Sequence, residues 1–375
     1  MELKISVVKT QKQIHEFIKL PFKIYKENNC WVPPMISDMK DTLDKNKNPL
    51  FQKGEHEIFI AILNGKTVGR ICVGYDITLS KIRHNDSGYI TMFECIDNYE
   101  VAKLLFDTAV QWLRDKGINS IRGPISPKGG GSDEYRGLLI DAFDSPPVIM
   151  NSYNHEYYVS FFEKYGFKKY LDLYAYLISP ELMFVKNPEK SIKYAQKRYN
   201  FNVEPINLKR IDKEIDAIKH ILDLAVPEEW SDMIPPTLDE LHGIADHLIK
   251  FADPDIIPIA RSGDEPVGFG IALPDYNQVL KHMNGRITPL SLLKFMYYKR
   301  KINGARFFVM FVIPSFRKKG VSYAIYYHSF MNAIKKGYLW GEGSTIGETN
   351  TNMRNDIENI GGNHYKTYRI YSLDF

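Results

Sequence analysis

Apolar and polar residues follow a pattern along the chain that occurs twice. In the first half, apolar runs at 58–63 and 67–74 flank the turn sequence Asn64-Gly65-Lys66, which predicts a β-hairpin. In the second half, runs at 256–261 and 267–272 flank a Gly- and Pro-containing turn and predict a second hairpin.

A predicted amphipathic helix follows each hairpin, at 99–116 and at 322–336. Apolar residues recur in both at the i, i+3, i+4, i+7 spacing of a helix with one buried face. Gly117 and Gly337 stand directly after these helices, and glycine is the residue that best adopts the left-handed conformation of a helix end. The same helix-and-glycine signal therefore appears at the same place in each half.

Each half then closes on a strand, a short helix ending in glycine, and a last strand. The final helix and strand are predicted at 157–165 and 167–178 in the first half, and at 352–360 and 364–373 in the second. One domain plan used twice explains this order better than one large domain. The Pro- and Lys-containing stretch 179–200 breaks the pattern, so we predict two domains, 1–180 and 181–375.

The two halves differ by one insertion each, at 123–150 and at 275–304. The first contains three consecutive glycines, and the second contains an apolar helical run, 290–298. Insertions on a repeated scaffold often carry specificity, but dimer contacts or neutral decoration are equally open interpretations.

Composition narrows the class of protein without naming a function. Among 375 residues, 44% are hydrophobic and 25% are charged, and the net charge is only +4. This balance is ordinary for a globular protein and too mild to indicate a nucleic-acid partner. We expect no membrane span and no signal peptide, and hence the cytoplasm. Cysteine and histidine spacing predicts neither disulfides nor a metal site.

The strongest chemical signal follows the apolar run 307–313. Pro314 ends that run, and the sequence Arg317-Lys318-Lys319-Gly320-Val321-Ser322 leads into the second amphipathic helix. The first N–H groups of a helix have no partner inside it, and its dipole adds partial positive charge there. Gly320 lets the backbone approach a phosphate closely, and the three basic residues add full charges. A solvated turn is the alternative, and the strand–loop–helix context favours a diphosphate site.

The segment 312–322 resembles the motif Val-x-Pro-x-x-Arg/Gln-x-x-Gly-x-Gly/Ala of GNAT (Gcn5-related N-acetyltransferase) proteins, with Ser322 at the last position. Downstream, Asn350, Ile357 and Gly361 are similar to the family's Asn-x-x-Ala-x-x-x-Tyr-x-x-x-Gly helix, with Ile357 where the family often has an acid tyrosine. The resemblance covers about 200–375.

The resemblance implies an α/β (α+β) fold with two tandem GNAT-like domains, each a mixed, mostly antiparallel sheet flanked by helices. It also implies acetyl-CoA, or another acyl-CoA, as the cofactor. The first half matches the fold plan but reads Asp97-Asn98-Tyr99-Glu100 at the loop position, with no glycine or basic residue. We therefore expect the cofactor in the second domain only.

Family chemistry assigns further roles by resemblance. The splayed strand would offer backbone N–H groups of Phe311, Val312 and Ile313 to the cofactor. Glu342 and Glu348 are candidate general bases. Tyr365, Tyr368 or Tyr371 on the last strand could replace the missing acid, and Tyr371 is the preferred candidate. Further expected contacts are Asn350 to the cofactor, or as a helix cap, and Glu228, Glu229 and Trp230 to the acceptor.

The sequence thus predicts an acyl-CoA-dependent N-acyltransferase that acetylates an amine of a small-molecule or amino-acid-like acceptor. Two alternatives stay open: a non-catalytic acyl-CoA-binding or interaction protein, and a tandem transferase with a long-chain acyl or aminoacyl donor. A homodimer is a further open expectation.

Overall fold

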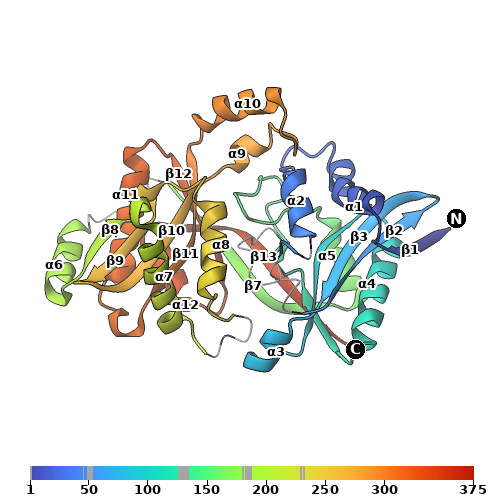
Figure 1. The fold of residues 1–375 in the computed structure, drawn as a ribbon, viewed down its shortest axis with the longest axis horizontal. Helices are drawn as coiled ribbons and strands as arrows, with labels where there is room; N and C mark the ends of the chain where they lie inside the picture. Colours follow the sequence, from blue (N-terminus) through green and yellow to red (C-terminus); the bar gives the residue numbers. More distant parts are fainter. Residues whose placement is uncertain are drawn as a thin grey trace. The chain divides into compact units, whose positions relative to one another are not determined.

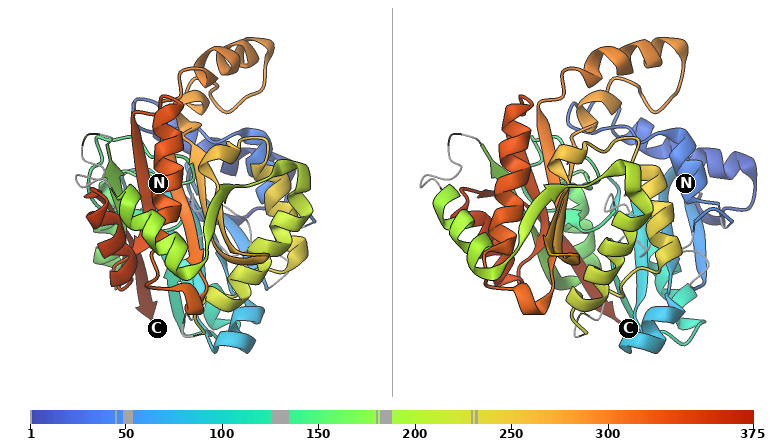
Figure 2. Two further views of the ribbon diagram at one scale, coloured as in Figure 1. Left: turned by 90° about the vertical axis from the view of Figure 1, so that its left-hand side faces the viewer. Right: turned by 60° about the vertical axis from the view of Figure 1, so that its left-hand side comes forward.

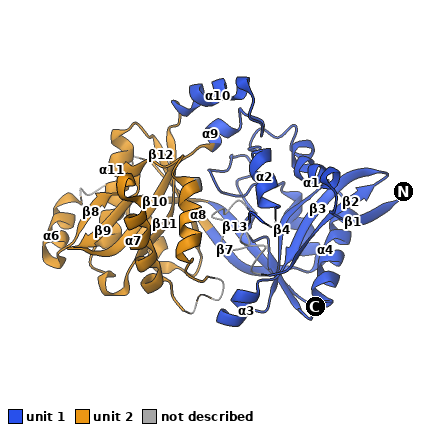
Figure 3. Ribbon diagram, in the orientation of Figure 1, with its two compact units in different colours: residues 1–173, 277–300, 366–375 blue, residues 174–276, 301–365 orange. Residues whose placement is uncertain are grey.

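The computed structural model describes residues 2–44, 46–48, 54–125, 135–179, 181, 188–228, 230 and 233–375. These residues form two compact units, shown in Figure 3. Unit 1 comprises residues 1–173, 277–300 and 366–375, and unit 2 comprises residues 174–276 and 301–365.

Unit 1 is built on a mixed sheet with the strand order β1-β2-β3-β4-β5-β13-β7. Its strands are β1 (Leu3–Val7), β2 (His56–Leu63), β3 (Lys66–Gly74), β4 (Gly88–Cys95), β5 (Ser120–Gly123), β6 (Leu138–Leu139, beside β13), and parts of β7 (Lys168–Ile178) and β13 (Asn363–Asp374). Its helices are α1 (Gln11–Ile24), α2 (Ile36–Thr42), α3 (Ile77–Arg83), α4 (Tyr99–Arg114), α5 (Tyr157–Tyr165), α9 (Asn277–Leu280) and α10 (Pro289–Lys299) (Figure 1).

Unit 2 repeats this plan with the strand order β8-β9-β10-β11-β12, and the second half of β7 lies beside β12. Its strands are β8 (Asn202–Pro205), β9 (Pro258–Ser262), β10 (Glu265–Pro274), β11 (Gly304–Val312) and β12 (Trp340–Gly347). Its helices are α6 (Glu189–Tyr199), α7 (Ile211–Ala225), α8 (Leu238–Leu248), α11 (Val321–Lys335) and α12 (Thr351–Asn359), with 3₁₀ turns η2 (Leu208–Arg210), η3 (Pro254–Ile256) and η4 (Pro314–Phe316).

The repeated pattern of the sequence is confirmed in these elements. Both hairpins form, as β2–β3 and β9–β10, and α5 has the bounds predicted for it. The glycines predicted to end helices adopt positive φ, as the left-handed conformation requires: Gly117, Gly166, Gly337 and Gly361. The hydrophobic pattern therefore fixes the order of elements in each unit.

Helices cover both faces of each sheet, and the core lies between the layers. In unit 1, α4 packs on one face through Leu105 and Val101, which lie against Gly69 of β3, and α1 packs on the other through Phe17 beside Arg70. In unit 2, α11 packs against β9, β10 and β11 from one side and α7 packs against β10 and β11 from the other (Figure 2).

The fourth strand of each unit, β4 or β11, carries a bulge and then diverges from its parallel neighbour. The β4–β5 pairing is described only at Gly88–Ile121 and Tyr89–Arg122, and the β11–β12 pairing runs from Gly304–Trp340 to Phe307–Gly343. The register shifts next to Arg70 in the β3–β4 pair and next to Ile271 in the β10–β11 pair. A bulge bends its strand and releases it from the ladder, which opens the sheet beside it.

The compact units divide the chain differently from the predicted domains. Strands β7 and β13 contribute residues to both units, and the insertion helices α9 and α10 belong to unit 1 although they connect two strands of unit 2. The boundary at 180/181 therefore stays a prediction, and residues 182–187 beside it lie outside the described part of the chain. No helix among the described residues is long and apolar enough to cross a bilayer.

Candidate cofactor and acceptor site

The loop from β11 to α11 in unit 2 joins a strand to the N-terminus of a helix, in the order that the sequence predicts. Pro314 begins the 3₁₀ turn η4, and Lys318 and Gly320 both adopt left-handed φ, of 61° and 81°. The Arg317 guanidinium donates to the carbonyls of Val312, at 3.3 Å, and Ala225, at 2.9 Å. Arg317 therefore ties the loop to the end of α7.

The N-terminus of α11 carries no side-chain cap. Its first intrahelical bond runs from the Ala324 N–H to the Gly320 carbonyl, so helix geometry gives the preceding N–H groups no partner inside the helix. Gly320 is the N-cap residue, and a Cβ at this position would lie 3.2 Å from the Ala195 Cβ. This helix end therefore offers N–H groups without intrahelical partners, which is what an anion site at a helix N-terminus requires.

Three side chains set the charge around this helix end. Lys318 is exposed, and the Lys319 ammonium lies 4.8 Å from the Phe316 ring and 5.6 Å from the Tyr199 ring. Ser322 donates to the Asp356 carboxylate at 3.0 Å. Burial raises the pKa of the Asp356 carboxyl, and the hydrogen bond from Ser322 partly offsets this.

The second half of β11 offers backbone groups where β12 has diverged. The Ile313 N–H donates to the Val267 carbonyl, so this predicted donor is engaged with β10. N–H groups alternate in direction along a strand, so those of Val312 and Met310 point away from β10, toward the opened side. The sequence analysis did not select Met310. N–H groups alternate in direction along any strand, but the sequence alone does not show which edge of the strand lacks a neighbouring strand.

Glu342 and Tyr365 form a direct pair on the face of the unit 2 sheet opposite α11. Glu342 of β12 is fully buried and accepts hydrogen bonds from the Tyr365 and Ser344 hydroxyls. The register places Glu342 beside the buried Arg306, whose guanidinium donates to Ser344. The Tyr365 side chain is half-buried, whereas the Glu342 carboxylate that its hydroxyl contacts is fully buried.

The remaining catalytic candidates do not join this pair. The Tyr371 hydroxyl donates to Glu163, and its ring packs on Phe162 in the core of unit 1, whereas Glu342 lies in unit 2. Glu348 stands in the turn after β12, and its backbone carbonyl accepts from Arg354.

Asn350 occupies the N-cap position of α12. Its side-chain oxygen accepts a hydrogen bond from the Met353 N–H at 3.2 Å. This contact is the helix-capping alternative of the sequence analysis, so a role for Asn350 in cofactor binding stays a prediction.

The acceptor candidates lie after α7. Trp230 is 38% exposed, and its ring centroid is 6.3 Å from that of Phe311 on β11. Phe311 in turn lies 6.1 Å from Phe269 of β10. Glu228 is exposed, and Glu229 lies outside the described residues. An apolar aromatic surface therefore borders the open half of β11.

In unit 1, side chains occupy the places that correspond to the α11 N-terminus and to the open half of β11. The Asn98 side chain caps α4 by accepting from the Glu100 N–H at 3.0 Å, which occupies the helix end that stays uncapped in α11. All eight residues of β4 are buried.

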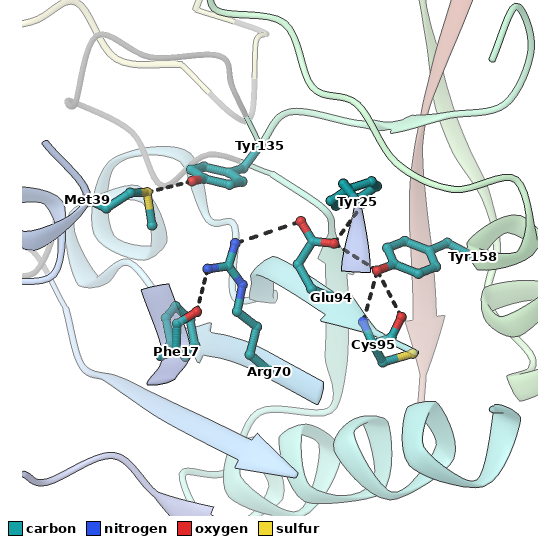
Figure 4. Close-up of polar contacts among 8 residues, drawn as sticks. All are labelled: Phe17, Tyr25, Met39, Arg70, Glu94, Cys95, Tyr135 and Tyr158. Atoms are coloured by element: carbon teal, nitrogen blue, oxygen red, sulfur yellow. Dashed lines mark hydrogen bonds and ion pairs between the residues drawn. The ribbon is translucent and has the colours of Figure 1, made fainter. Parts of the chain in front are cut away.

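A buried polar cluster fills the space beside β4, as Figure 4 shows. The Glu94 carboxylate accepts hydrogen bonds from Tyr25 and Tyr158, both at 2.8 Å, and lies 3.7 Å from the Arg70 guanidinium. Arg70 also donates to the Phe17 carbonyl at 2.8 Å. Sequence reasoning missed this cluster because Arg70 and Glu94 are single charges inside apolar strands. Among the described residues, no group of three or more His, Cys, Asp or Glu side chains could hold a metal ion.

These features define a class of fold. Each unit has a mixed sheet whose bulged fourth strand diverges from a parallel neighbour, followed by a helix. The chain superposes on a tandem GNAT protein from the clavulanic acid biosynthesis pathway with a TM-score of 0.59 at 9% identity, covering 100% of this chain and 98% of that one. The chain therefore has the GNAT fold in tandem, and the predicted fold class is confirmed.

Further solved structures agree at the level of the fold. A GCN5-related N-acetyltransferase from Sphaerobacter thermophilus matches 99% of the chain and 95% of its own length, with a TM-score of 0.52 at 10% identity. A GCN5-related glucosamine N-acetyltransferase region in a fungal multi-domain β-N-acetylglucosaminidase gives a TM-score of 0.58 at 14% identity, over 99% of this chain and 38% of that chain.

Two curated proteins are similar along nearly the whole sequence. The protein named bacterial ceramide synthase, from Caulobacter vibrioides, is 28% identical over 99% of this chain and 97% of its own length. Protein YghO of Escherichia coli is 29% identical over 96% of this chain and 93% of its own length. A comparison with protein-family models finds no match.

Proposed function

We propose that the chain transfers an acyl group from an acyl-CoA to the nitrogen of an amine. The observation that carries this proposal is the uncapped, glycine-led N-terminus of α11 beside the open half of β11. In the proposed reaction a C–N bond forms, the C–S bond of the thioester breaks, and the amine loses a proton. Coenzyme A leaves as the thiol, so the products are an amide and free thiol.

The donor would be held by backbone more than by side chains. The N–H groups at the start of α11 suit the diphosphate, with Lys318 and Lys319 adding charge. Arg317 is proposed to position this loop, because its guanidinium already binds two backbone carbonyls. The Val312 and Met310 N–H groups are proposed to face the acyl carbonyl and stabilise the charge that develops on its oxygen.

Proton transfer is assigned to the Tyr365–Glu342 pair. Tyr365 is the tyrosine of the last strand that contacts a buried carboxylate in the same unit as the loop, which favours it over Tyr371. The hydroxyl would exchange a proton with the reacting amine or the leaving thiolate, and Glu342 would hold its orientation.

The acceptor is proposed to be a long-chain amine of the sphingoid-base type, and the donor a long-chain acyl-CoA. This rests on the relative named bacterial ceramide synthase, because a ceramide is an N-acylated sphingoid base. The exposed Trp230 ring and the partly buried Phe311 ring beside it are compatible with an apolar acceptor. Acetyl transfer to a small polar amine is the competing version of the same chemistry.

Release of free thiol tests the proposal with the whole chain. Palmitoyl-CoA together with sphinganine should release thiol faster than either substrate alone. The amide product should have the mass of the two substrates together minus the mass of coenzyme A. Acetyl-CoA with small polar amines is the comparison, and faster turnover there would favour acetylation. Binding of acyl-CoA without thiol release from any amine would support the non-catalytic alternative.

A further inference from the structure

The insertion between β10 and β11 exposes an unusual amount of apolar surface. Among the described residues, 17 large hydrophobic side chains are exposed, and six of them lie between 287 and 297. Their exposed fractions run from 48% to 64%: Ile287, Leu290, Leu292, Leu293, Met296 and Tyr297. Scattered exposed apolar residues are normal, but a contiguous group of this size marks an interaction surface.

Helix α10 buries a polar residue and exposes its apolar side, which is the reverse of an ordinary surface helix. Its buried residue is Ser291, at 5% exposure, and Phe295 and Tyr298 on the same side are only partly exposed. At 3.6 residues per turn, five of the exposed side chains form a continuous stripe on the opposite side. This exposed apolar face of α10 consists of Leu290, Leu292, Leu293, Met296 and Tyr297.

Positive charge surrounds the exposed apolar face of α10. From residue 276 to 304 the sequence contains six Lys or Arg residues and no Asp or Glu. At helical spacing, Lys294 and Lys299 stand at the two borders of the face. The other four are Lys281, Arg286, Arg300 and Lys301. Apolar residues in the middle and cations at the edges are the arrangement of a helix that lies in a membrane interface, since long cationic side chains reach the phosphates from there.

The helix is presented on a fixed base within unit 1. Val279 and Met283 are buried, the Asn277 side chain donates to the Pro147 carbonyl at 2.9 Å, and the Gly285 carbonyl accepts from the Ile36 N–H at 3.0 Å. The Tyr298 ring stacks on His282 at 3.6 Å. Figure 2 shows α10 projecting outward beyond α9. Thr288 and Ser291 form a capping box, so the helix is complete without a partner.

We infer that the exposed apolar face of α10 inserts into the interface of an anionic phospholipid bilayer. The lack of any carboxylate in the segment makes an anionic surface the complementary occupant. The attachment is peripheral, with one helix lying in the plane of the surface. This inference stands on the surface of unit 1 and holds whether or not the proposed transferase reaction occurs.

Vesicle sedimentation of the full chain tests the inference. Vesicles of phosphatidylcholine with phosphatidylglycerol should bind the chain, and vesicles of phosphatidylcholine alone should bind it more weakly. Leu290→Gln with Leu293→Gln should weaken binding to the anionic vesicles about tenfold or more, because two inserted side chains lose their apolar burial. Leu224→Gln is the control, since Leu224 is an exposed leucine of α7 in unit 2 and lies outside the 276–304 segment.

Charge is tested separately from apolar insertion. Replacing Lys299, Arg300 and Lys301 by Gln should weaken binding to anionic vesicles by about fivefold per cation removed. Circular dichroism and the unfolding temperature of each variant check that the fold is retained. Absence of binding to anionic vesicles, or binding that the double leucine variant retains, would overturn the inference. So would a dimer in solution that the same double variant converts to monomer, because the face would then cover a second copy.

Discussion

Strands β4 and β11 hold the same place in their units, but their surroundings differ. Both are fourth in the strand order, both are bulged, and both diverge from a parallel neighbour before a helix begins. Their partners are also equivalent, since Gly69 faces Cys95 as Gly268 faces Val312, and both glycines lie against the following helix. At the next position, Arg70 pairs with Glu94 in unit 1, and Phe269 pairs with Phe311 in unit 2.

The two units differ in the groups that lie beside the opened strand and at the start of the helix that follows it. In unit 1, Tyr25, Tyr158 and Arg70 surround Glu94, and Asn98 caps the helix, so side chains of the unit occupy both places. In unit 2, the helix begins on a glycine without a side-chain cap, and aromatic rings border the strand. One fold thus supports a version closed by its own side chains and an open version suited to a ligand.

The closed version should depend strongly on Glu94. Glu94→Ala leaves the Arg70 guanidinium buried without its carboxylate, which should cost about 3–5 kcal/mol of stability. Urea unfolding measures this, with Glu27→Ala as a control at an exposed carboxylate. An unchanged unfolding midpoint would show that the cluster is not what completes unit 1.

The open version should depend on Gly320. Gly320→Asp places a negative charge at the helix N-terminus and a side chain toward Ala195, so coenzyme A affinity should fall about 100-fold, or about 2.7 kcal/mol. Calorimetry measures this. Gly117→Asp is the control, because Gly117 also has positive φ but lies after α4 in unit 1. Equal affinities in both folded variants would contradict the assignment.

A change at Tyr365 should lower the rate of acyl transfer without weakening the binding of coenzyme A. Tyr365→Phe removes the hydroxyl that contacts Glu342, so kcat should fall roughly 10- to 100-fold while coenzyme A affinity changes less than about twofold. Thiol release over a range of pH checks whether the pH profile changes as well. Tyr170→Phe, at an exposed ring of β7, is the control. Full activity in Tyr365→Phe would remove the proposed proton path.

A smaller effect is expected at the cap of α4. Asn98→Ala should cost about 1 kcal/mol of stability, because the Glu100 N–H loses its acceptor. Asn98→Asp keeps an acceptor and should be nearly neutral. Coenzyme A affinity should stay unchanged in both variants. Weaker affinity in Asn98→Ala would place the cofactor near unit 1.

The smallest expected effect is a change in pH dependence. Burial raises the pKa of Glu94, so the folded chain holds this proton more tightly than the unfolded chain does. This stabilising contribution is complete below the unfolded pKa and is lost as pH rises through the folded pKa. Glu94→Gln should therefore reduce the fall of the urea midpoint that occurs as pH rises above the ordinary pKa of a glutamate carboxyl. An unaltered pH profile would contradict the raised pKa.

Local signals predicted much of the fold, because they lie within a few residues of each other. Turn glycines, helix periodicity and the motif before α11 predicted the hairpins, the helices and the loop that leads into α11. The contacts that form the site depend on register across strands distant in sequence. Tyr365 and Tyr371 both lie on β13, yet one contacts Glu342 in unit 2 and the other packs in unit 1. Alternation along the strand could not distinguish them, because the strand contributes to both units.

The central claim is that the acyl-CoA donor binds to unit 2 and not to unit 1. The stoichiometry of coenzyme A binding to the whole chain, measured by titration calorimetry, tests this claim most directly. The closed surroundings of β4 and the open N-terminus of α11 predict one molecule bound per chain. Two molecules bound per chain would contradict the claim.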